Sequence, residues 1–131
     1  MTYIMLSDLW RKSLREPEKF WESVAEELYW RKRWEKVLDS SNPPFYRWFV
    51  GGETNIAYNA LERHNHEKTA FIWVNSDLKS RRYTYGELKR EADKWACLLS
   101  RLGVREGDRV TIYMPMIPEA AFAVLATAKI G

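Results

Sequence analysis

Cysteine is almost absent from this sequence: its 131 residues include only Cys97. One cysteine cannot form an internal disulfide, and it cannot supply the several thiolates of a multi-cysteine metal site. A reducing compartment is the simplest expectation, and the sequence therefore predicts a cytoplasmic protein.

Long apolar runs are also missing. The most apolar window, residues 117–130, contains Glu119 and Lys129, and it is shorter than the roughly 17 residues that the shortest membrane spans need. The start, "MTYIMLSDLWRKS", lacks a basic beginning followed by a long apolar core and the small-residue cleavage site of a secretion signal. We therefore expect neither export nor a membrane partner.

The positive charge is modest, with a net charge of +3 and an isoelectric point of about 9.0. One stretch, "YWRKRWEK", places Arg31, Lys32 and Arg33 between Trp30 and Trp34, where cations could meet phosphates and indoles could stack on bases. The alternative is a solvated basic face with the tryptophans turned into the core. The weak net charge favours the second interpretation, so no nucleic-acid partner is expected and nucleic-acid binding stays a minor alternative.

Recognisable catalytic motifs are lacking, since no Gly-x-Ser-x-Gly elbow and no dinucleotide fingerprint occurs. His64 and His66 form a pair without further ligands, and zinc needs three or four. Cys97 falls in the middle of an expected helix, where an inert packing residue is favoured over a nucleophile. Gly51 and Gly52 lack the context of a phosphate loop and are expected to form a hairpin turn. We assign no catalytic, cofactor-binding or metal-binding residue.

The first third of the chain has the pattern of helices. Pro17 suits the first turn of a helix, and apolar residues then recur at helical spacing on one face, which we expect to pack on the rest of the chain: Phe20, Trp21, Val24, Ala25 and Leu28. The stretch "DSSNPPFYRWFVGGETN" predicts an irregular linker followed by a short hairpin. Asn55 can cap the helix "IAYNALERH" that follows.

The second half begins with "TAFIWVNSDLKSRRYTY", which predicts two short strands around a polar turn. Thr84 and Glu87 have the spacing of a capping box. The helix that they open carries an apolar stripe of Leu88, Ala92, Trp95, Leu99 and Leu102. Gly103 stands where a left-handed residue ends such a helix.

The last stretch, "GDRVTIYMPMIPEAAFAVLATAKIG", predicts a buried strand over "RVTIYM" and then a helix. Pro118 fits the first turn of that helix, and its alanines allow close packing on a sheet. Such a unit is normally completed by a parallel strand. The sequence therefore predicts a mixed α/β fold: N-terminal helices and short β-hairpins, followed by an incomplete Rossmann-like parallel layer that ends at Gly131.

Two long stretches carry a specific resemblance. "NPPFYRWFVGGETNIAYNALERH", residues 42–64, and "YTYGELKREADKWACLLSRLGVREGDRVTIYMPMIPEAAFAVLATAKIG", residues 83–131, resemble the start of AMP-forming acetyl-CoA synthetases and related short-chain acyl-CoA synthetases. The stretch "EKFWESVAEELYWRKRWEKVLD" is similar to the helical segment at the N-terminus of that family. The resemblance implies two regions: residues 1–68 as the N-terminal region and residues 69–131 as the beginning of the AMP-binding domain.

This resemblance implies an enzyme that activates a short carboxylic acid with ATP and Mg²⁺ to an acyl-adenylate and transfers the acyl group to coenzyme A. The family's phosphate-binding loop, ribose-binding aspartate and C-terminal catalytic lysine have no counterpart here. Gly131 is accordingly expected to be an internal point of a larger adenylating domain. The chain alone is expected to bind no cofactor, whereas the full enzyme would use ATP, Mg²⁺ and coenzyme A.

Two functions follow from these expectations. The first is the N-terminal portion of an acetate-CoA ligase, inactive alone, whose partner is the remainder of the synthetase. The second is a stand-alone assembly module that pairs in trans with a separately encoded remainder. Either way, an open sheet edge would favour self-association.

Overall fold

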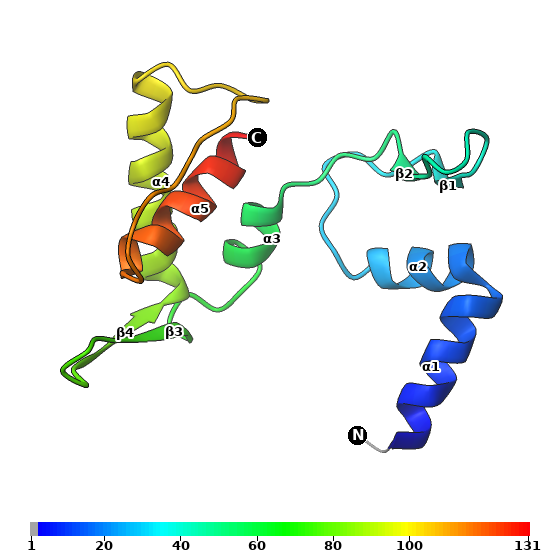
Figure 1. Ribbon diagram of the computed structural model, residues 1–131, viewed down its shortest axis with the longest axis horizontal. Helices are drawn as coiled ribbons and strands as arrows, with labels where there is room; N and C mark the ends of the chain where they lie inside the picture. The colour runs from blue at the N-terminus through cyan, green and yellow to red at the C-terminus, as the bar shows by residue number, and fades with distance from the viewer. Residues whose placement is uncertain (1–2) are drawn as a thin grey trace. The chain divides into compact units, whose positions relative to one another are not determined.

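The computed structural model describes the backbone of residues 3–131 and the side chains from Asp8 onward. The chain forms two compact units, one that ends at Thr54 and one that runs from Asn55 to Gly131 (Figure 1). The resemblance described above implies a boundary between two regions after residue 68. The division into compact units lies earlier because helix α3 (Ile56–Leu61) packs with helices α4 (Tyr85–Arg101) and α5 (Pro118–Ile130) of the second unit.

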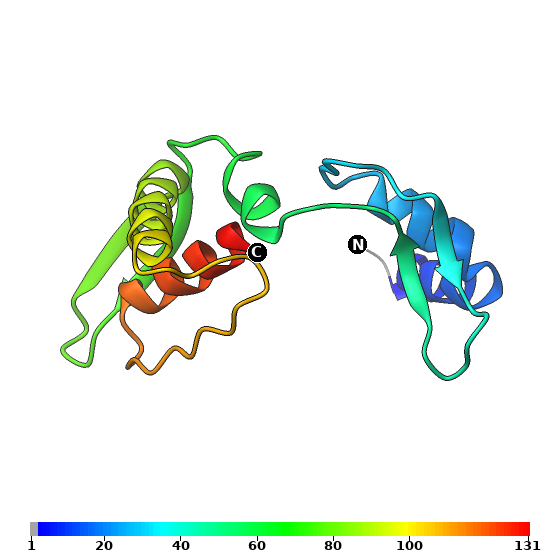
Figure 2. The ribbon, with the colours of Figure 1, turned by 90° about the horizontal axis from the view of Figure 1, so that it is seen from above.

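The N-terminal unit contains two helices and a hairpin (Figure 2). Helix α1 spans Tyr3–Arg15 and helix α2 spans Pro17–Ala25, with Pro17 in its first turn as predicted. Strands β1 (Lys36–Asp39) and β2 (Arg47–Val50) pair antiparallel, with Leu38 opposite Trp48.

The turn of this hairpin differs from the prediction. The chain reverses in the loop between β1 and β2, which contains Pro43 and Pro44, and the two glycines follow β2 instead. Gly51 has a φ of 78°, which favours glycine, and Gly52 passes close to the Trp30 ring. The expected hairpin turn at these glycines was therefore wrong, because they bend the chain back over the aromatic core after the hairpin is complete.

Three aromatic rings make the centre of the N-terminal unit. The rings of Trp30, Trp34 and Phe49 lie 4.9–5.3 Å apart, centroid to centroid. The Trp30 indole nitrogen also donates a hydrogen bond of 2.8 Å to the Ala25 carbonyl, which joins α2 to this cluster. Burial and a satisfied indole together fix these rings in place.

Helix α2 buries less of its apolar face than the sequence predicted. Ala25 is buried, but Trp21, Val24 and Leu28 are exposed. The predicted packing of these three side chains is wrong for the described residues, because only the side of α2 that carries Ala25 faces the Trp30 ring cluster.

The C-terminal unit packs helices against one hairpin. Strands β3 (Thr69–Val74) and β4 (Ser80–Thr84) pair antiparallel as predicted, and helix α4 (Tyr85–Arg101) follows at once. Helix α5 (Pro118–Ile130) lies beside α4 (Figure 1). The hydrophobic core of the C-terminal unit consists of Leu61, Tyr83, Leu88, Ala92 and Phe122.

Helix α4 has both predicted caps. Thr84 Oγ1 accepts from the Glu87 N–H at 3.2 Å, and the Glu87 carboxylate accepts from the Thr84 N–H at 2.8 Å. At the other end Gly103, with a φ of 101°, donates to the Ser100 carbonyl, while the Val104 N–H donates to the Leu99 carbonyl. The paired bonds form a Schellman motif, so both ends of this helix are satisfied by local sequence.

The expected Rossmann-like layer is not confirmed. The segment Arg109–Met114, predicted as a strand, has no regular secondary structure, and both sheets in the described residues are antiparallel pairs. A strand exists only with a hydrogen-bonded neighbour, and none of the described residues provides one. The alanines of α5 accordingly pack on α3 and α4 and not on a sheet: Ala123 and Ala126 are buried there.

Candidate functional site

The two histidines contact aromatic and main-chain groups. The His64 ring stacks on Tyr85, with ring centroids 4.3 Å apart, and the His66 carbonyl accepts from the Gly86 N–H. In the part of the chain that the structure describes, no three His, Cys, Asp or Glu side chains gather as metal ligands would.

The basic stretch around Arg31 has the geometry of a packed surface. Trp34 is buried and Trp30 is half-buried, and both indoles pack against each other and against Phe49. The cations each pair with a carboxylate: Arg31 with Glu53, Lys32 with Glu35, and Arg33 with Glu26 and Glu22. This arrangement matches the packing interpretation of the stretch.

Cys97 is exposed, so the packing role that the sequence predicted for it is wrong. It lies on α4 next to Lys94 and Leu98, which are also exposed, whereas Leu88 and Ala92 face the core. Helical periodicity explains the difference, because the position of Cys97 falls outside the buried stripe. No histidine of the described residues contacts it in a way that would activate a thiol.

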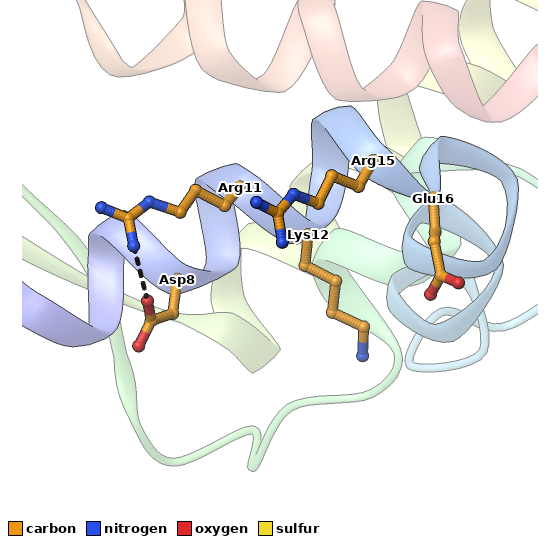
Figure 3. A pocket seen from close by; sticks show the side chains of 5 residues that line it. All are labelled: Asp8, Arg11, Lys12, Arg15 and Glu16. Carbon is orange, nitrogen blue, oxygen red and sulfur yellow. Dashed lines mark ion pairs between the residues drawn. The ribbon is translucent and has the colours of Figure 1, made fainter.

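A shallow hollow runs along α1 (Figure 3). Its walls are the side chains of Asp8, Arg11, Lys12 and Arg15 on α1 and of Glu16 directly after it, and all five are exposed. Arg11 pairs with Asp8 across 3.7 Å, as the dashed line in Figure 3 marks. Exposed charges of mixed sign on one helix do not form a binding site.

The charged carboxylate of Asp39 is buried. Its carboxylate accepts from Arg47 at 2.5 Å, from the Ser41 N–H at 3.2 Å and from Lys36 at 3.2 Å. The Arg47 guanidinium is the main reason that the pKa of Asp39 lies well below its usual range. Perturbed acids can mark active sites, but this one ties the end of β1 to the start of β2 and has a structural role.

An ionic cluster joins three helices of the C-terminal unit. The Lys129 ammonium contacts Glu62 at 3.1 Å and also Asp93, and Lys89 contacts Asp93 at 2.7 Å and Glu62 at 3.3 Å. Burial alone would raise the pKa of Asp93, but the hydrogen bonds from Lys129 and Lys89 outweigh it and hold this pKa below its usual value. The same Asp93 and Glu62 contacts raise the pKa of Lys89, against the effect of its partial burial.

Asn55 caps two helices with one side chain. Its Oδ1 accepts from the Tyr58 N–H at 3.1 Å, which is the cap of α3 that the sequence predicted. Its Nδ2 donates to the carbonyls of Ala128 at 2.8 Å and Lys129 at 3.4 Å, at the C-terminal end of α5. The second cap could not be predicted, because it depends on α5 reaching this point in space.

The segment Arg109–Met114 is held at both ends and unpaired between them. On one side the Gly107 N–H donates to the Gly131 carbonyl at 2.9 Å, and on the other the Trp73 indole donates to the Met116 carbonyl at 2.8 Å. Within the described residues, no main-chain group of Arg109–Met114 forms a hydrogen bond. The alternation of apolar and polar residues in this segment predicts a strand, which the described residues do not form.

Two comparisons define the class of protein. Residues 6–60 match the family described as "Acetyl-coenzyme A synthetase N-terminus", and residues 58–131 match the family described as "AMP-binding enzyme". The fold is similar to that of a solved acetoacetyl-CoA synthetase from Streptomyces lividans, with a TM-score of 0.84 and 35% identity over 92% of this chain and 19% of that one. The class is therefore that of adenylate-forming acyl-CoA synthetases. The AMP-binding match covers more than half of the chain, and the chain belongs to the AMP-binding enzyme family.

Proteins with similar sequences are acyl-CoA ligases too. The acetyl-coenzyme A synthetase of Deinococcus radiodurans is 54% identical over 126 residues, which cover 93% of this chain and 19% of the relative. The propionate–CoA ligase of Salmonella typhimurium is 43% identical and covers 95% of this chain and 20% of its own length. The chain thus spans about a fifth of the length of the relatives it matches. Its described helices include none that is both long and apolar enough to cross a membrane.

Proposed function

We propose that this chain is the N-terminal portion of a short-chain acyl-CoA ligase, with acetate as the favoured substrate, and that it is inactive on its own. The observation that carries the proposal is the 54% identity to the Deinococcus acetyl-coenzyme A synthetase across 93% of this chain but only 19% of that enzyme. An identity of this size over both compact units indicates a shared role within a larger protein.

The chemistry proposed for the whole enzyme has two steps. A carboxylate oxygen attacks the α-phosphorus of ATP, which is bound with Mg²⁺, and pyrophosphate leaves. The thiolate of coenzyme A then attacks the carbonyl carbon of the acyl-adenylate, and AMP leaves. Both steps develop charge that preorganised donors must stabilise. Among the described residues, no three His, Cys, Asp or Glu side chains gather as ligands of the Mg²⁺ would.

The chain's proposed contribution is a scaffold. Large apolar side chains stay exposed on both units, among them Trp10, Trp21, Ile72 and Tyr113. Exposed apolar surface of this extent is typical of surfaces that another part of a protein covers. The acyl pocket cannot be assigned to residues of this chain, so the choice of substrate depends on the relatives. Acetate is proposed over propionate because the acetyl-coenzyme A synthetase is 54% identical to this chain and the propionate–CoA ligase 43%.

Complementation in trans tests the proposal. The Deinococcus synthetase would be produced without the stretch that matches this chain, and then mixed or co-expressed with residues 1–131. The expected result is a one-to-one complex that releases pyrophosphate from ATP only when acetate is present, whereas neither piece alone does so. The matched control is residues 1–131 with Leu61 and Phe122 both changed to Asp, which disrupts the core of the C-terminal unit.

Two outcomes would contradict the proposal. One is acetate-dependent pyrophosphate release by the purified chain without any remainder. The other is a folded wild-type chain that neither binds the shortened synthetase nor restores its activity.

One observation favours a second function, that of a stand-alone assembly module, which the same experiment can test. The unpaired segment Arg109–Met114 presents free main-chain groups, which is what an assembly module that pairs with a separate polypeptide requires. The two functions differ in the source of the remainder. Purification of the tagged chain from its own cells, with mass spectrometry of what comes with it, separates a covalent remainder from a second polypeptide.

A further inference from the structure

Two side chains hold the C-terminal end of α5, and we infer that both of them, Asn55 and Lys129, are positioning residues of the proposed ligase. By fixing the end of α5, they fix the place from which the remainder of the enzyme continues. The inference rests on the proposed function, in which this chain is a scaffold and the remainder supplies the catalytic groups. The contacts of these side chains form the α5 clamp, which consists of Asn55, Glu62, Asp93 and Lys129.

The first part of the clamp acts on the main chain of α5. The last carbonyls of a helix have no partner within the helix. Here the Asn55 side-chain amide donates to the carbonyl of Ala128 at 2.8 Å and to that of Lys129 at 3.4 Å. Asn55 is itself held, because its Oδ1 accepts from the Tyr58 N–H at 3.1 Å. The end of α5 is thereby tied to the start of α3, which lies beside it in both Figure 1 and Figure 2.

The second part of the clamp is the ammonium of Lys129. It contacts the Glu62 carboxylate at 3.1 Å and also the Asp93 carboxylate. Glu62 directly follows α3, and Asp93 belongs to α4. A cation in the last turn of a helix is also favoured by the helix dipole. One side chain therefore joins the last turn of α5 to both of the helices that pack against it.

A third contact shows how closely the end of α5 is held. The Gly107 N–H donates to the Gly131 carbonyl at 2.9 Å. Gly131 has a φ of 121°, and a β-carbon on it would lie only 2.7 Å from Cγ of Glu106. The loop that contains Glu106 and Gly107 thus packs directly against the end of the helix. The Gly107 amide proton can serve as a reporter, because its hydrogen bond exists only while the end of α5 stays in place.

A fixed helix end matters for catalysis because reacting groups must be aligned closely. A displacement of about 1 Å, even one that starts far from the chemistry, can lower a rate by about 100-fold. A remainder that continues from a loosened helix end would occupy several positions, and only some of them would be productive. Enzyme molecules in unproductive positions lower kcat, whereas the KM of the productive molecules stays the same.

Variants of a chimeric ligase test the clamp. In the chimera, residues 1–131 replace the matching stretch of the Deinococcus synthetase, and every clamp contact is kept because both partners lie within those residues. Asn55→Asp keeps an oxygen to cap α3 but has no N–H for Ala128. Lys129→Met removes the bridging ammonium, whereas Lys129→Arg keeps the positive charge. Thr84→Ala is the matched control, since it weakens a cap in the same unit and leaves the clamp intact.

The kinetic result is a loss in kcat alone. Acetate-dependent pyrophosphate release would be measured at a temperature at which circular dichroism shows every variant to be fully folded. Asn55→Asp and Lys129→Met are expected to lower kcat about tenfold or more, with the KM for acetate and for ATP within about twofold of the wild type. Lys129→Arg should recover most of this loss, and Thr84→Ala should keep the kcat of the wild type.

Hydrogen exchange measures the position of the helix end without any activity. In residues 1–131 alone, the Gly107 amide is expected to exchange about tenfold faster in Asn55→Asp than in the wild type, because local opening frees its N–H. In Thr84→Ala the Gly107 amide should exchange at the wild-type rate.

The outcomes separate the clamp from the proposed function. The clamp would be overturned by a wild-type kcat in both clamp variants, by a loss that appears in KM instead, by an equal loss in Thr84→Ala, or by unchanged exchange at Gly107. Each of these results would leave the proposed function intact. A wild-type chimera that releases no pyrophosphate with acetate would count against the proposed function instead.

Discussion

The side-chain amide of Asn55 donates a hydrogen bond to the main-chain carbonyl of Ala128, 2.8 Å away, although 73 positions separate the two residues in the sequence. The same side chain accepts from the Tyr58 N–H, so one residue satisfies the N-terminus of α3 and the C-terminus of α5. Helix ends leave main-chain groups without partners, and a residue that supplies both a donor and an acceptor can join two of them. Asn55 thereby fixes the first helix of the C-terminal unit to its last.

Removal of this double cap should destabilise the C-terminal unit. Asn55→Ala is expected to lower the free energy of unfolding by about 1–3 kcal/mol, because it deletes an N-cap and leaves a carbonyl of α5 unsatisfied. Asn55→Ser keeps an N-cap oxygen for Tyr58 but cannot reach Ala128, and it should recover about 1 kcal/mol of the loss. Urea unfolding followed by circular dichroism measures both. A serine variant as stable as the wild type would show that the contact with Ala128 contributes nothing.

The ionic cluster at Lys129 should contribute more than an ordinary surface pair. Lys129→Met removes the ammonium that bridges Glu62 and Asp93, while Lys89 continues to pair with both. These side chains are partly shielded from water, so we expect a loss of about 1 kcal/mol or more in the free energy of unfolding.

Lys94→Met is the matched control for the cluster. Lys94 pairs with Glu91 on the same helix at 2.7 Å, but its side chain is 68% exposed. Exposed pairs of this kind contribute about 0.3–0.5 kcal/mol. Equal losses for Lys94→Met and Lys129→Met, measured in the same urea titration, would contradict a special role for the cluster.

Local signals in the sequence were sufficient to predict the helix ends and the second hairpin. Thr84 and Glu87 cap α4, Gly103 ends it, and Pro17 begins α2, because each of these interactions involves neighbours within a few residues. The turn between β3 and β4 is likewise local, since Asn75 Oδ1 accepts from the N–H groups of Asp77 and Lys79. Such features need no knowledge of the distant chain.

Features that depend on distant partners were predicted poorly. Residues 109–114 have the composition of a strand, but strand formation requires a neighbour, which no described residue supplies. The second cap of Asn55 and the bridge at Lys129 require α3, α4 and α5 to meet, which periodicity alone does not specify. The segment Arg109–Met114 depends on distant partners in the same way, because a strand there would need a neighbouring strand that the described residues do not contain.

The capping box should make the C-terminal unit less stable in acid. The hydrogen bond from the Thr84 N–H holds the pKa of Glu87 below its usual value, and burial opposes this effect. A carboxyl with a lowered pKa stabilises the fold above the pKa that it has when unfolded, about 4.3, and this contribution is lost as the pH falls through the folded pKa. The contribution of Glu87 to stability should therefore be constant from pH 7 to about pH 5 and should decrease below pH 4.

Glu87→Gln separates this effect from general acid denaturation. Glutamine can still accept from the Thr84 N–H but does not titrate, so the difference in stability between wild type and variant should shrink between pH 5 and pH 3. Thr84→Ala removes the other half of the box and should cost about 1 kcal/mol at all of these pH values. A wild-type curve that runs parallel to the glutamine variant throughout would show that Glu87 does not titrate with folding.

Gly52 should tolerate no side chain, because the aromatic cluster occupies the space. A β-carbon at this position would lie 2.8 Å from Cζ3 of Trp30 and 3.0 Å from the Phe49 carbonyl oxygen. Gly52→Ala must therefore displace a packed ring, and we expect a loss of about 1–3 kcal/mol with a change in tryptophan fluorescence. Gly103→Ala meets open space and should cost only about 1 kcal/mol for its left-handed backbone, without any change in fluorescence. If Gly52→Ala left both the fluorescence and the stability unchanged, the ring cluster would not be the fixed core of the N-terminal unit.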